Sequence, residues 1–285
     1  MILRGGYFMN KLGVMIVLTA GADILLEMKK AKEIGCECCQ LCVWDPTLYT
    51  DLLAEEIVGA SKETEIEVST LWAGWSGAKE WNFTGGPVTL GLVPEAYRMK
   101  RTEEVLAGVD FAVKIGCSRV ATHVGFLPEN VNDPQYGGVI AILRYIVAYC
   151  KKKGINFLFE TGQETPVTLL RVIEELGFDN VGINMDTANL ILYGKANSAD
   201  AILVFGKYVM DTHIKDGFYP TDGMRLGREV AVGSGLADIP EVIKRLQAVN
   251  YTGNYIIERE ISGEQQTKDI IDTLAFLKSI LRQER

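Results

Sequence analysis

Short runs of apolar and β-branched residues alternate with longer amphipathic stretches along the whole chain. The apolar runs have the length of one buried strand, and the stretches between them repeat with the 3.6-residue period of a helix that covers a sheet. Such alternation is typical of repeated strand–helix units. The predicted strands span residues 12–18, 37–43, 66–72, 118–123, 155–159, 181–185, 208–214 and 254–258.

The helical period is clearest after the third and the eighth predicted strands. Glycines follow several of these periodic stretches, where a left-handed residue commonly ends a helix. Asp238 and Glu241 are spaced as a capping box, with Pro240 in the first turn. The periodic apolar residues are Val105, Val109, Ala112 and Val113, then Ile270, Ile271, Leu274, Leu277 and Leu281. The predicted helix-ending glycines are Gly35, Gly116, Gly154 and Gly177.

Eight strand–helix units without a Pro/Ser-rich linker predict one α/β domain over residues 1–285, a closed (β/α)8 TIM barrel. Residues 1–8 are expected to be a frayed tail, because Met9 is an alternative start. A doubly wound open sheet is the alternative. It favours fewer strands and a glycine fingerprint after the first one, whereas residues 19–23 read TAGAD.

Composition narrows the class of partner. The formal charge of -8 and the pI near 5.0 argue against nucleic-acid binding, which needs lysines and arginines against phosphates. Residues 11–22 resemble a signal peptide, but the apolar run of 12–18 suits a buried first strand better. No apolar stretch is long enough to span a membrane, so we expect a cytoplasmic protein with a small-molecule substrate.

Four of the six cysteines lie in CECCQLC, residues 36–42. In an extended strand the side chains alternate between faces, so these thiolates cannot surround one tetrahedral zinc ion. We expect free cysteines that act as small buried apolar side chains in a reducing compartment.

Five consecutive predicted strands end on an imidazole or a carboxylate. In a (β/α)8 barrel the carboxyl ends of all strands meet on one face, where catalytic residues stand. The spacings of 37, 26, 27 and 45 residues fit one strand–helix unit each. The residues are His123, Glu160, Asp186, His213 and Glu258.

Converging carboxylates repel one another and raise each other's pKa unless a cation lies among them. Two glutamates, one aspartate and one histidine without a thiolate favour a divalent ion such as Mn²⁺, with Mg²⁺, Co²⁺ or Zn²⁺ as alternatives. Glu260 shares a strand face with Glu258, so alternation alone leaves the eighth-strand ligand open between them. We favour Glu258, which directly follows the apolar run.

Several motifs at these strand ends resemble the xylose isomerase-like barrel family of sugar and sugar-phosphate isomerases and epimerases, over essentially the whole chain. The motifs are HVGFLPE (123–129), FETGQE (159–164), NMDTANL (184–190), HIKDG (213–217), GSGLAD (233–238) and YTGNYIIERE (251–260).

The resemblance implies that Glu160, Asp186, His213 and Glu258 ligate one metal ion. It also implies that Glu160 and Glu258 face each other across the substrate as catalytic residues. In the epimerases of the family such a pair takes a proton from the carbon beside a carbonyl and returns it from the other face. A metal on the carbonyl oxygen would stabilise the enediolate, which agrees with elementary acid–base chemistry.

Four further residues are expected to bind substrate: His123, Asn189, Lys215 and Trp72. His123 resembles the family's strand-four histidine, for which structural packing is the alternative. Asn189 stands where sugar epimerases of the family commonly have a histidine; it can bond a hydroxyl but cannot titrate near neutrality. Lys215 and Asp216 could bind a substrate oxygen or pair with neighbours, which is the preferred interpretation for Asp216.

Two loops carry weaker signals. LWAGWSGAKEW, residues 71–81, contains three of the four tryptophans and could stack on a sugar or form a lid or subunit contact. GSG, residues 233–235, could cradle a phosphate on its amides, although a turn into a capped helix accounts for it equally well.

The prediction is therefore a divalent-metal-dependent isomerase or epimerase of a sugar or sugar derivative, with homo-oligomers permitted. One alternative is a metal-dependent lyase of the inosose or dehydroshikimate dehydratase type. Another is a subunit that keeps the metal site without catalysis. A related barrel nuclease is disfavoured, because its three-metal cluster needs more than two histidines.

Overall fold

Eight parallel strands close into a barrel in the computed structural model, which describes residues 10–283. The predicted tail of residues 1–8 lies outside that range. Around the barrel the hydrogen-bonded order is β1-β10-β7-β6-β5-β4-β3-β2. The barrel strands are β1 (Leu12–Leu18), β2 (Cys38–Val43), β3 (Glu67–Ala73), β4 (Arg119–Thr122), β5 (Asn156–Glu160), β6 (Val181–Asp186), β7 (Val209–Ile214) and β10 (Tyr255–Ile257).

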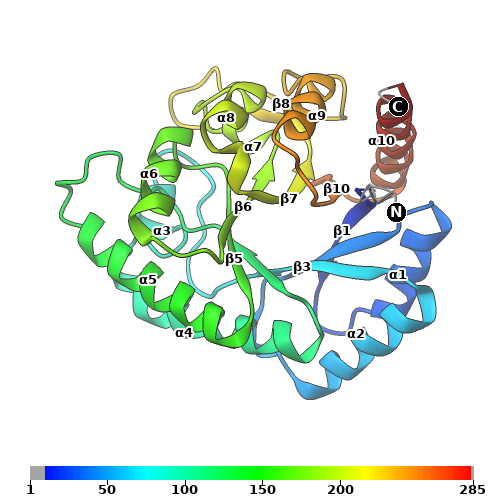
Figure 1. The fold of residues 1–285 in the computed structure, drawn as a ribbon, viewed down its shortest axis with the longest axis horizontal. Coiled ribbons are helices and arrows are strands. Elements are labelled where there is room, and N and C mark those ends of the chain that lie inside the picture. The colour runs from blue at the N-terminus through cyan, green and yellow to red at the C-terminus, as the bar shows by residue number, and fades with distance from the viewer. Residues whose placement is uncertain (1–9, 284–285) are drawn as a thin grey trace, which may run out of the picture.

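All eight predicted strands are confirmed, each with boundaries within one residue of those predicted. The closed order excludes the open-sheet alternative. Helices surround the strands (Figure 1). They are α1 (Ile24–Glu33), α2 (Asp51–Thr64), α3 (Gly86–Thr89), α4 (Glu95–Lys114), α5 (Tyr136–Lys153), α6 (Pro166–Leu176), α7 (Asn189–Leu192), α8 (Ser198–Phe205), α9 (Ile239–Ala248) and α10 (Glu264–Gln283), with 3-10 turns η1 (Pro46–Leu48) and η2 (Gly206–Tyr208).

The apolar periodicity locates most of the helix–barrel core. In α4, Val105, Val109 and Ala112 are buried, and in α10 Ile270, Leu274 and Leu277 are buried. Leu281 packs half-buried against the same core. Val113 and Ile271 were wrongly placed on the buried face: they are 46% and 45% exposed, because each lies one position beyond the stripe that faces the barrel.

The helix-end signals are mostly confirmed. Gly35, Gly116, Gly154 and Gly177 all have φ between 70° and 93°, the left-handed region that favours glycine. Asp238 accepts a hydrogen bond from the Glu241 N–H and so caps α9. The predicted capping box is only half formed, because the Glu241 carboxylate pairs with Lys244 and Arg245 on the next turn.

All six cysteines are buried and free, as predicted. Burial is the largest cause that raises the pKa of each thiol, to about 11 in Cys36 and Cys117 and about 12 in Cys150. They therefore act as small apolar side chains. Within the described range 10–283, no helix has the length and apolar character of a membrane span.

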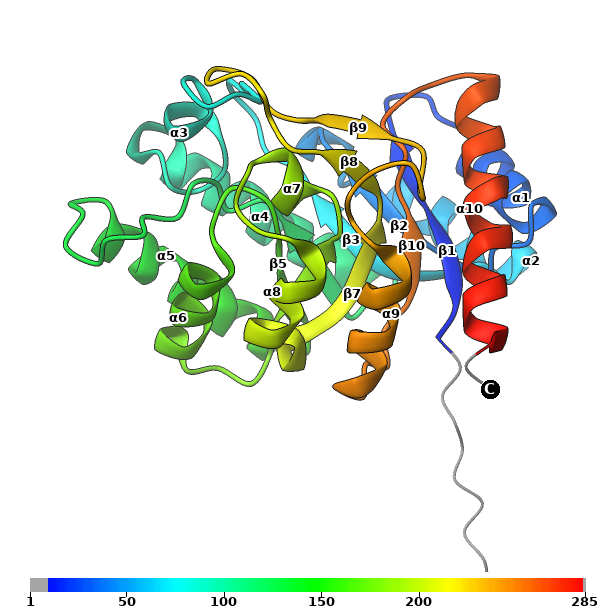
Figure 2. The same cartoon turned by 90° about the horizontal axis from the view of Figure 1, so that it is seen from above.

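An antiparallel hairpin that the sequence pattern did not predict follows β7. Its strands are β8 (Asp216–Phe218) and β9 (Arg228–Val230). The connection between them reaches over the barrel end toward the segment around α3 (Figure 2). There Asn82 forms a β-bridge with Arg225, and the Phe83 N–H donates to the Met224 carbonyl at 3.3 Å. The hairpin therefore joins the loops after β3 and β7 across the barrel mouth.

Asp216 organises the start of this hairpin. Its carboxylate accepts hydrogen bonds of 2.9 Å from the backbone N–H groups of Gly233, Gly235 and Ala237. The structural interpretation of Asp216 is thus confirmed. The suggestion that residues 233–235 cradle a phosphate is wrong here, since a carboxylate of the chain already takes these amides.

The loop between β3 and α4 packs closely on the loop after β4. Gly91 has φ +69°, and a Cβ built there would lie 2.0 Å from the Val124 carbonyl oxygen. Next to it the Leu92 N–H donates to the same oxygen at 2.7 Å. This contact fixes the loop beside His123.

Replacing Gly91 by alanine should lower the free energy of unfolding by about 2 kcal/mol or more, because the new Cβ is both strained and in contact with backbone. Gly137→Ala is the matched control: nothing lies within 4 Å of its Cβ position in α5. That change should be neutral or stabilising by about 0.5–1 kcal/mol. Urea unfolding of both variants measures the difference; equal stabilities would contradict the contact.

Candidate metal centre

Four strand ends deliver the residues of the site. Glu160 ends β5, Asp186 ends β6, His213 lies in β7, and Glu258 directly follows β10. The register pairs Asp186 with His213, which brings these two strand ends to the same level. One ligand atom from each of the four residues lies within 4.8 Å of the others.

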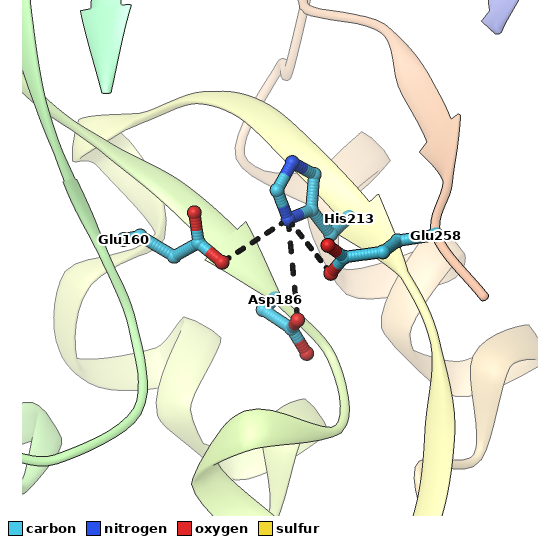
Figure 3. Close-up of side chains that lie close together, drawn as sticks. All are labelled: Glu160, Asp186, His213 and Glu258. Atoms are coloured by element: carbon cyan, nitrogen blue, oxygen red, sulfur yellow. Dashed lines mark hydrogen bonds and ion pairs between the residues drawn. The ribbon is translucent and has the colours of Figure 1, made fainter. Parts of the chain in front are cut away.

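His213 Nδ1 stands at the centre of the group. It is 3.2 Å from Glu160 Oε1, 3.2 Å from Glu258 Oε2 and 4.0 Å from Asp186 Oδ2. Figure 3 shows the two glutamates approaching this nitrogen from opposite sides, with Asp186 on a third side. Four donor atoms thus converge from four directions on one small volume.

The other imidazole nitrogen, Nε2, contacts a polar side chain inside the barrel. His213 Nε2 lies 2.9 Å from Gln40 Oε1, an acceptor. The Gln40 amide is itself oriented, because its nitrogen donates to Asn184 Oδ1 at 2.9 Å. With its proton on Nε2, His213 would offer the Nδ1 lone pair to a metal ion that replaces the Nδ1 proton, the arrangement usual for histidine ligands.

Asp186 offers one oxygen to the centre. Its Oδ1 accepts hydrogen bonds of 2.7 Å from the backbone N–H groups of Ala188 and Asn189. Its Oδ2 is fully buried and has no hydrogen-bond partner within the described part of the chain, although the Lys215 ammonium lies 3.5 Å from it. Since a buried carboxylate oxygen is normally bonded, this oxygen fits a metal ligand.

Glu160 is held by two donors on its other oxygen. The Trp72 indole N–H donates to Oε2, and the Asn184 amide nitrogen lies 3.4 Å from the same atom. These contacts turn Oε1 toward His213. Trp72 therefore orients Glu160, in addition to lining the pocket in front of it.

Burial and neighbouring charges move the pKa values in opposite directions. Burial raises the pKa of Asp186 to about 8, although Lys215 opposes it. Burial also raises the pKa of Glu258, but Lys215 and His213 outweigh it and hold the pKa well below its ordinary range. Burial lowers the pKa of His213, yet Glu160 and Glu258 hold it well above the ordinary value. The carboxylates thus stabilise a positive charge next to them, here on His213 and Lys215.

Lys215 supplies part of that charge. Its ammonium is 1% exposed and lies 2.8 Å from Glu260, 3.4 Å from Glu258 and 3.5 Å from Asp186. Burial lowers the pKa of Lys215, but these carboxylates keep it well above its ordinary value. Lys215 also lies 3.4 Å from Asn189 Oδ1.

A pocket of about 380 Å³ is lined by two of the four residues, Glu160 and Glu258, while Asp186 and His213 are fully buried beside it. Of the predicted substrate-binding residues, His123, Asn189 and Trp72 line it, whereas Lys215 lies behind the carboxylates. His123 is buried, with Nε2 3.6 Å from Glu160 Oε1, and burial lowers its pKa. The lining includes Met15, Val17, Cys42, Trp44, Trp72, Lys79, Trp81, His123, Glu160, Asn189, Tyr193, Leu226, Glu258 and Glu260.

All four tryptophans of the chain gather at this pocket. Trp44 contacts Trp72, Trp75 and Trp81, with ring centroids 4.4, 5.7 and 6.0 Å apart. Trp75 is fully buried beneath the others. The loop of residues 71–81 therefore contributes Trp72 and Trp81 to the pocket wall. The sequence analysis did not identify Trp44 as a pocket residue, although Trp44 directly follows β2.

Comparison with known proteins places these observations in a family. The profile of the xylose isomerase-like TIM barrel family matches residues 28–280. A xylose isomerase domain protein from Planctomyces limnophilus is 30% identical, with a TM-score of 0.89 over 95% of this chain and 97% of that one. The chain belongs to the xylose isomerase-like TIM barrel family.

More distant solved structures share the fold. A 3-keto-D-glucoside 4-epimerase from E. coli is 19% identical, with a TM-score of 0.67 over 95% of this chain and all of the other. A xylose isomerase-like TIM barrel protein from Mycobacterium smegmatis in complex with magnesium is 17% identical, with a TM-score of 0.67 over 92% and 90%. No curated protein matches the chain by sequence.

The metal-site geometry leads to a binding prediction. The chain should take up one equivalent of Mn²⁺, and Asp186→Asn should weaken this binding by roughly 100-fold or more, because it replaces a charged ligand by a neutral one. Glu164→Gln is the control, since it changes another buried carboxyl of the same strand–loop region outside the four. Isothermal titration calorimetry measures both; equal affinities would show that Asp186 is not a ligand.

Proposed function

We propose that this chain is a divalent-metal-dependent epimerase or isomerase of a sugar or sugar derivative. The observation that carries the proposal is the placement of Glu160 and Glu258 on opposite sides of His213 Nδ1, at the floor of one pocket (Figure 3). Sugar epimerases recur among the proteins of similar fold, such as an L-ribulose 3-epimerase at 16% identity and a TM-score of 0.72.

Glu160, Asp186, His213 and Glu258 would hold the ion, with Mn²⁺ the best match and Mg²⁺, Co²⁺ or Zn²⁺ as alternatives. When bound, the ion would polarise the substrate carbonyl and stabilise the negative charge that develops on its oxygen. Three carboxylates and one neutral imidazole give the centre enough negative charge to retain a divalent cation.

The two glutamates would move the proton. One removes it from the carbon beside the carbonyl, and the other returns it to the opposite face, which inverts that carbon. Trp72 and Asn184 fix the Glu160 carboxylate, and Lys215 fixes that of Glu258. Two bases held on opposite sides of the reacting carbon favour epimerisation over retention.

The polar pocket residues would orient the substrate hydroxyls. His123 has an unbonded Nδ1 within the described residues and stands beside Glu160, and Asn189 lines the same pocket with its amide. Because Asn189 cannot titrate near neutrality, its contribution is a hydrogen bond to a hydroxyl.

The reaction type is tested by incubating the Mn²⁺-loaded chain with ketoses in deuterated water. We expect deuterium at the carbon beside the carbonyl, together with the epimeric sugar, by NMR and mass spectrometry. Activity should vanish on chelation and return with Mn²⁺. A product lighter by one water would establish the alternative, a lyase of the dehydratase type, and absence of both products with a full metal site would favour a non-catalytic subunit.

The identity of the second base is tested by a matched pair. Glu258→Gln should lower kcat on the ketose identified above by on the order of 10³-fold, because it removes the base that faces Glu160. Glu260→Gln should cost less than about tenfold, since Glu260 is 59% exposed and pairs with Lys215. A larger loss in Glu260→Gln than in Glu258→Gln would reverse the assignment.

A further inference from the structure

Lys79 places an ammonium group on the pocket wall without an ion pair or hydrogen bond to any residue between 10 and 283. Its Nζ lies 5.3 Å from the Trp44 ring centroid and 5.7 Å from that of Trp75. Burial is the largest cause that lowers the pKa of Lys79. A half-buried ammonium is costly unless it is paired, and indole rings recover only part of that cost.

The backbone on both sides of Lys79 is fixed. The Ala78 carbonyl accepts a hydrogen bond of 2.9 Å from the fully buried Arg101 guanidinium. The Glu80 N–H donates to Thr89 Oγ1 at 3.0 Å. The ammonium is therefore carried by an ordered segment of the pocket wall, which lowers the entropic cost of using it for binding.

The other lysine at the site is already engaged. Lys215 is surrounded by Glu260, Glu258 and Asp186, and it lies behind the pocket wall. Among the residues that line the pocket, Lys79 is the one lysine or arginine, and no carboxylate oxygen of residues 10–283 lies within ion-pair distance of it. Asp45 and Glu104 act on its charge only from a longer distance. An anionic group bound in the pocket could therefore be its direct partner.

Lys79 lies against indole rings, and the same pocket is also lined by the apolar residues Met15, Val17 and Cys42 of β1 and β2. A neutral hydroxyl left there without a partner would cost about 1–3 kcal/mol. An anionic group that reaches Lys79 would form a charge-assisted hydrogen bond in the same surroundings. The part of the pocket beside Lys79 thus favours an anionic group over a neutral hydroxyl.

The number of donors distinguishes a carboxylate from a phosphate. Phosphate is usually bound by several donors, such as amides at a helix start or an arginine fork. The amides of Gly233 and Gly235 are used by Asp216, and Lys79 offers a single ammonium. One lysine matches the single negative charge of a carboxylate.

We propose that Lys79 binds a carboxylate of the substrate, so that the substrate class is a sugar acid. Its carbonyl end would lie beside Glu160 and Glu258, and its carboxylate would lie against Lys79 and the neighbouring Trp44. This assignment rests on the proposed function in one respect: it assumes that the sugar binds in the pocket lined by Glu160 and Glu258.

Three probes that differ only at carbon 6 test the assignment: D-fructuronate, D-fructose and D-fructose 6-phosphate. Calorimetric titration of the Mn²⁺-loaded chain should show D-fructuronate binding roughly tenfold or more tightly than D-fructose. Lys79→Met should reduce this preference to about twofold or less, and Lys79→Arg should retain most of it. Lys114→Met is the control, because it removes the same charge from an exposed ion pair with Asp51.

Equal affinity for D-fructuronate and D-fructose would overturn the proposal, as would a preference that survives in Lys79→Met. Tighter binding of D-fructose 6-phosphate than of D-fructuronate would overturn the carboxylate assignment. Because affinity and deuterium exchange are measured in separate experiments, a carboxylate preference in a chain that exchanges no deuterium would reject the epimerase function alone. Deuterium exchange without that preference would reject the sugar-acid assignment alone.

Discussion

The mutual repulsion of three carboxylates, two buried and one half-buried, is the constraint on which this site depends. Two carboxylates about 4 Å apart repel by about 4 kcal/mol at an effective dielectric constant of about 20. Glu160, Asp186 and Glu258 each offer an oxygen to a group of ligand atoms that lie within 4.8 Å of one another, so each carboxylate makes the others harder to ionise. The structure places His213 and Lys215 among them as counter-charges. A divalent cation bound between the carboxylates would offset their repulsion more completely.

The barrel makes this concentration of charge possible. Parallel strands in fixed register bring residues far apart in the chain to one rim, and the helix–barrel core stabilises the fold elsewhere. Polar residues inside the barrel then fix the geometry: Gln40 and Asn184 orient His213, and Trp72 orients Glu160. The loops after β3 and β7 meet above the site and enclose the pocket. Rigid support and limited access are both conditions for positioning a proton transfer.

The pattern of apolar runs was sufficient to predict the barrel and the polar residues at the carboxyl ends of its strands. The pattern locates where each strand ends, and the functional residues of such barrels stand at those ends. Asp216 was correctly assigned a structural role. The β8–β9 hairpin escaped prediction because its strands have three residues each and are set by the Asp216 carboxylate and not by an apolar period. Gln40 and Asn184 could have been recognised as polar residues inside buried strands. Lys79 could not have been recognised from the sequence, because its position depends on how the loop after β3 packs against Trp44 and Trp75.

We infer that Glu160, Asp186, His213 and Glu258 share one divalent ion. Anomalous diffraction from a crystal of the Mn²⁺-loaded chain would locate that ion. We expect a single strong manganese peak at about 2.0–2.3 Å from His213 Nδ1 and from one oxygen of each carboxylate. A manganese peak that lacks contact with any two of these residues, in a crystal where the four side chains are ordered, would contradict it.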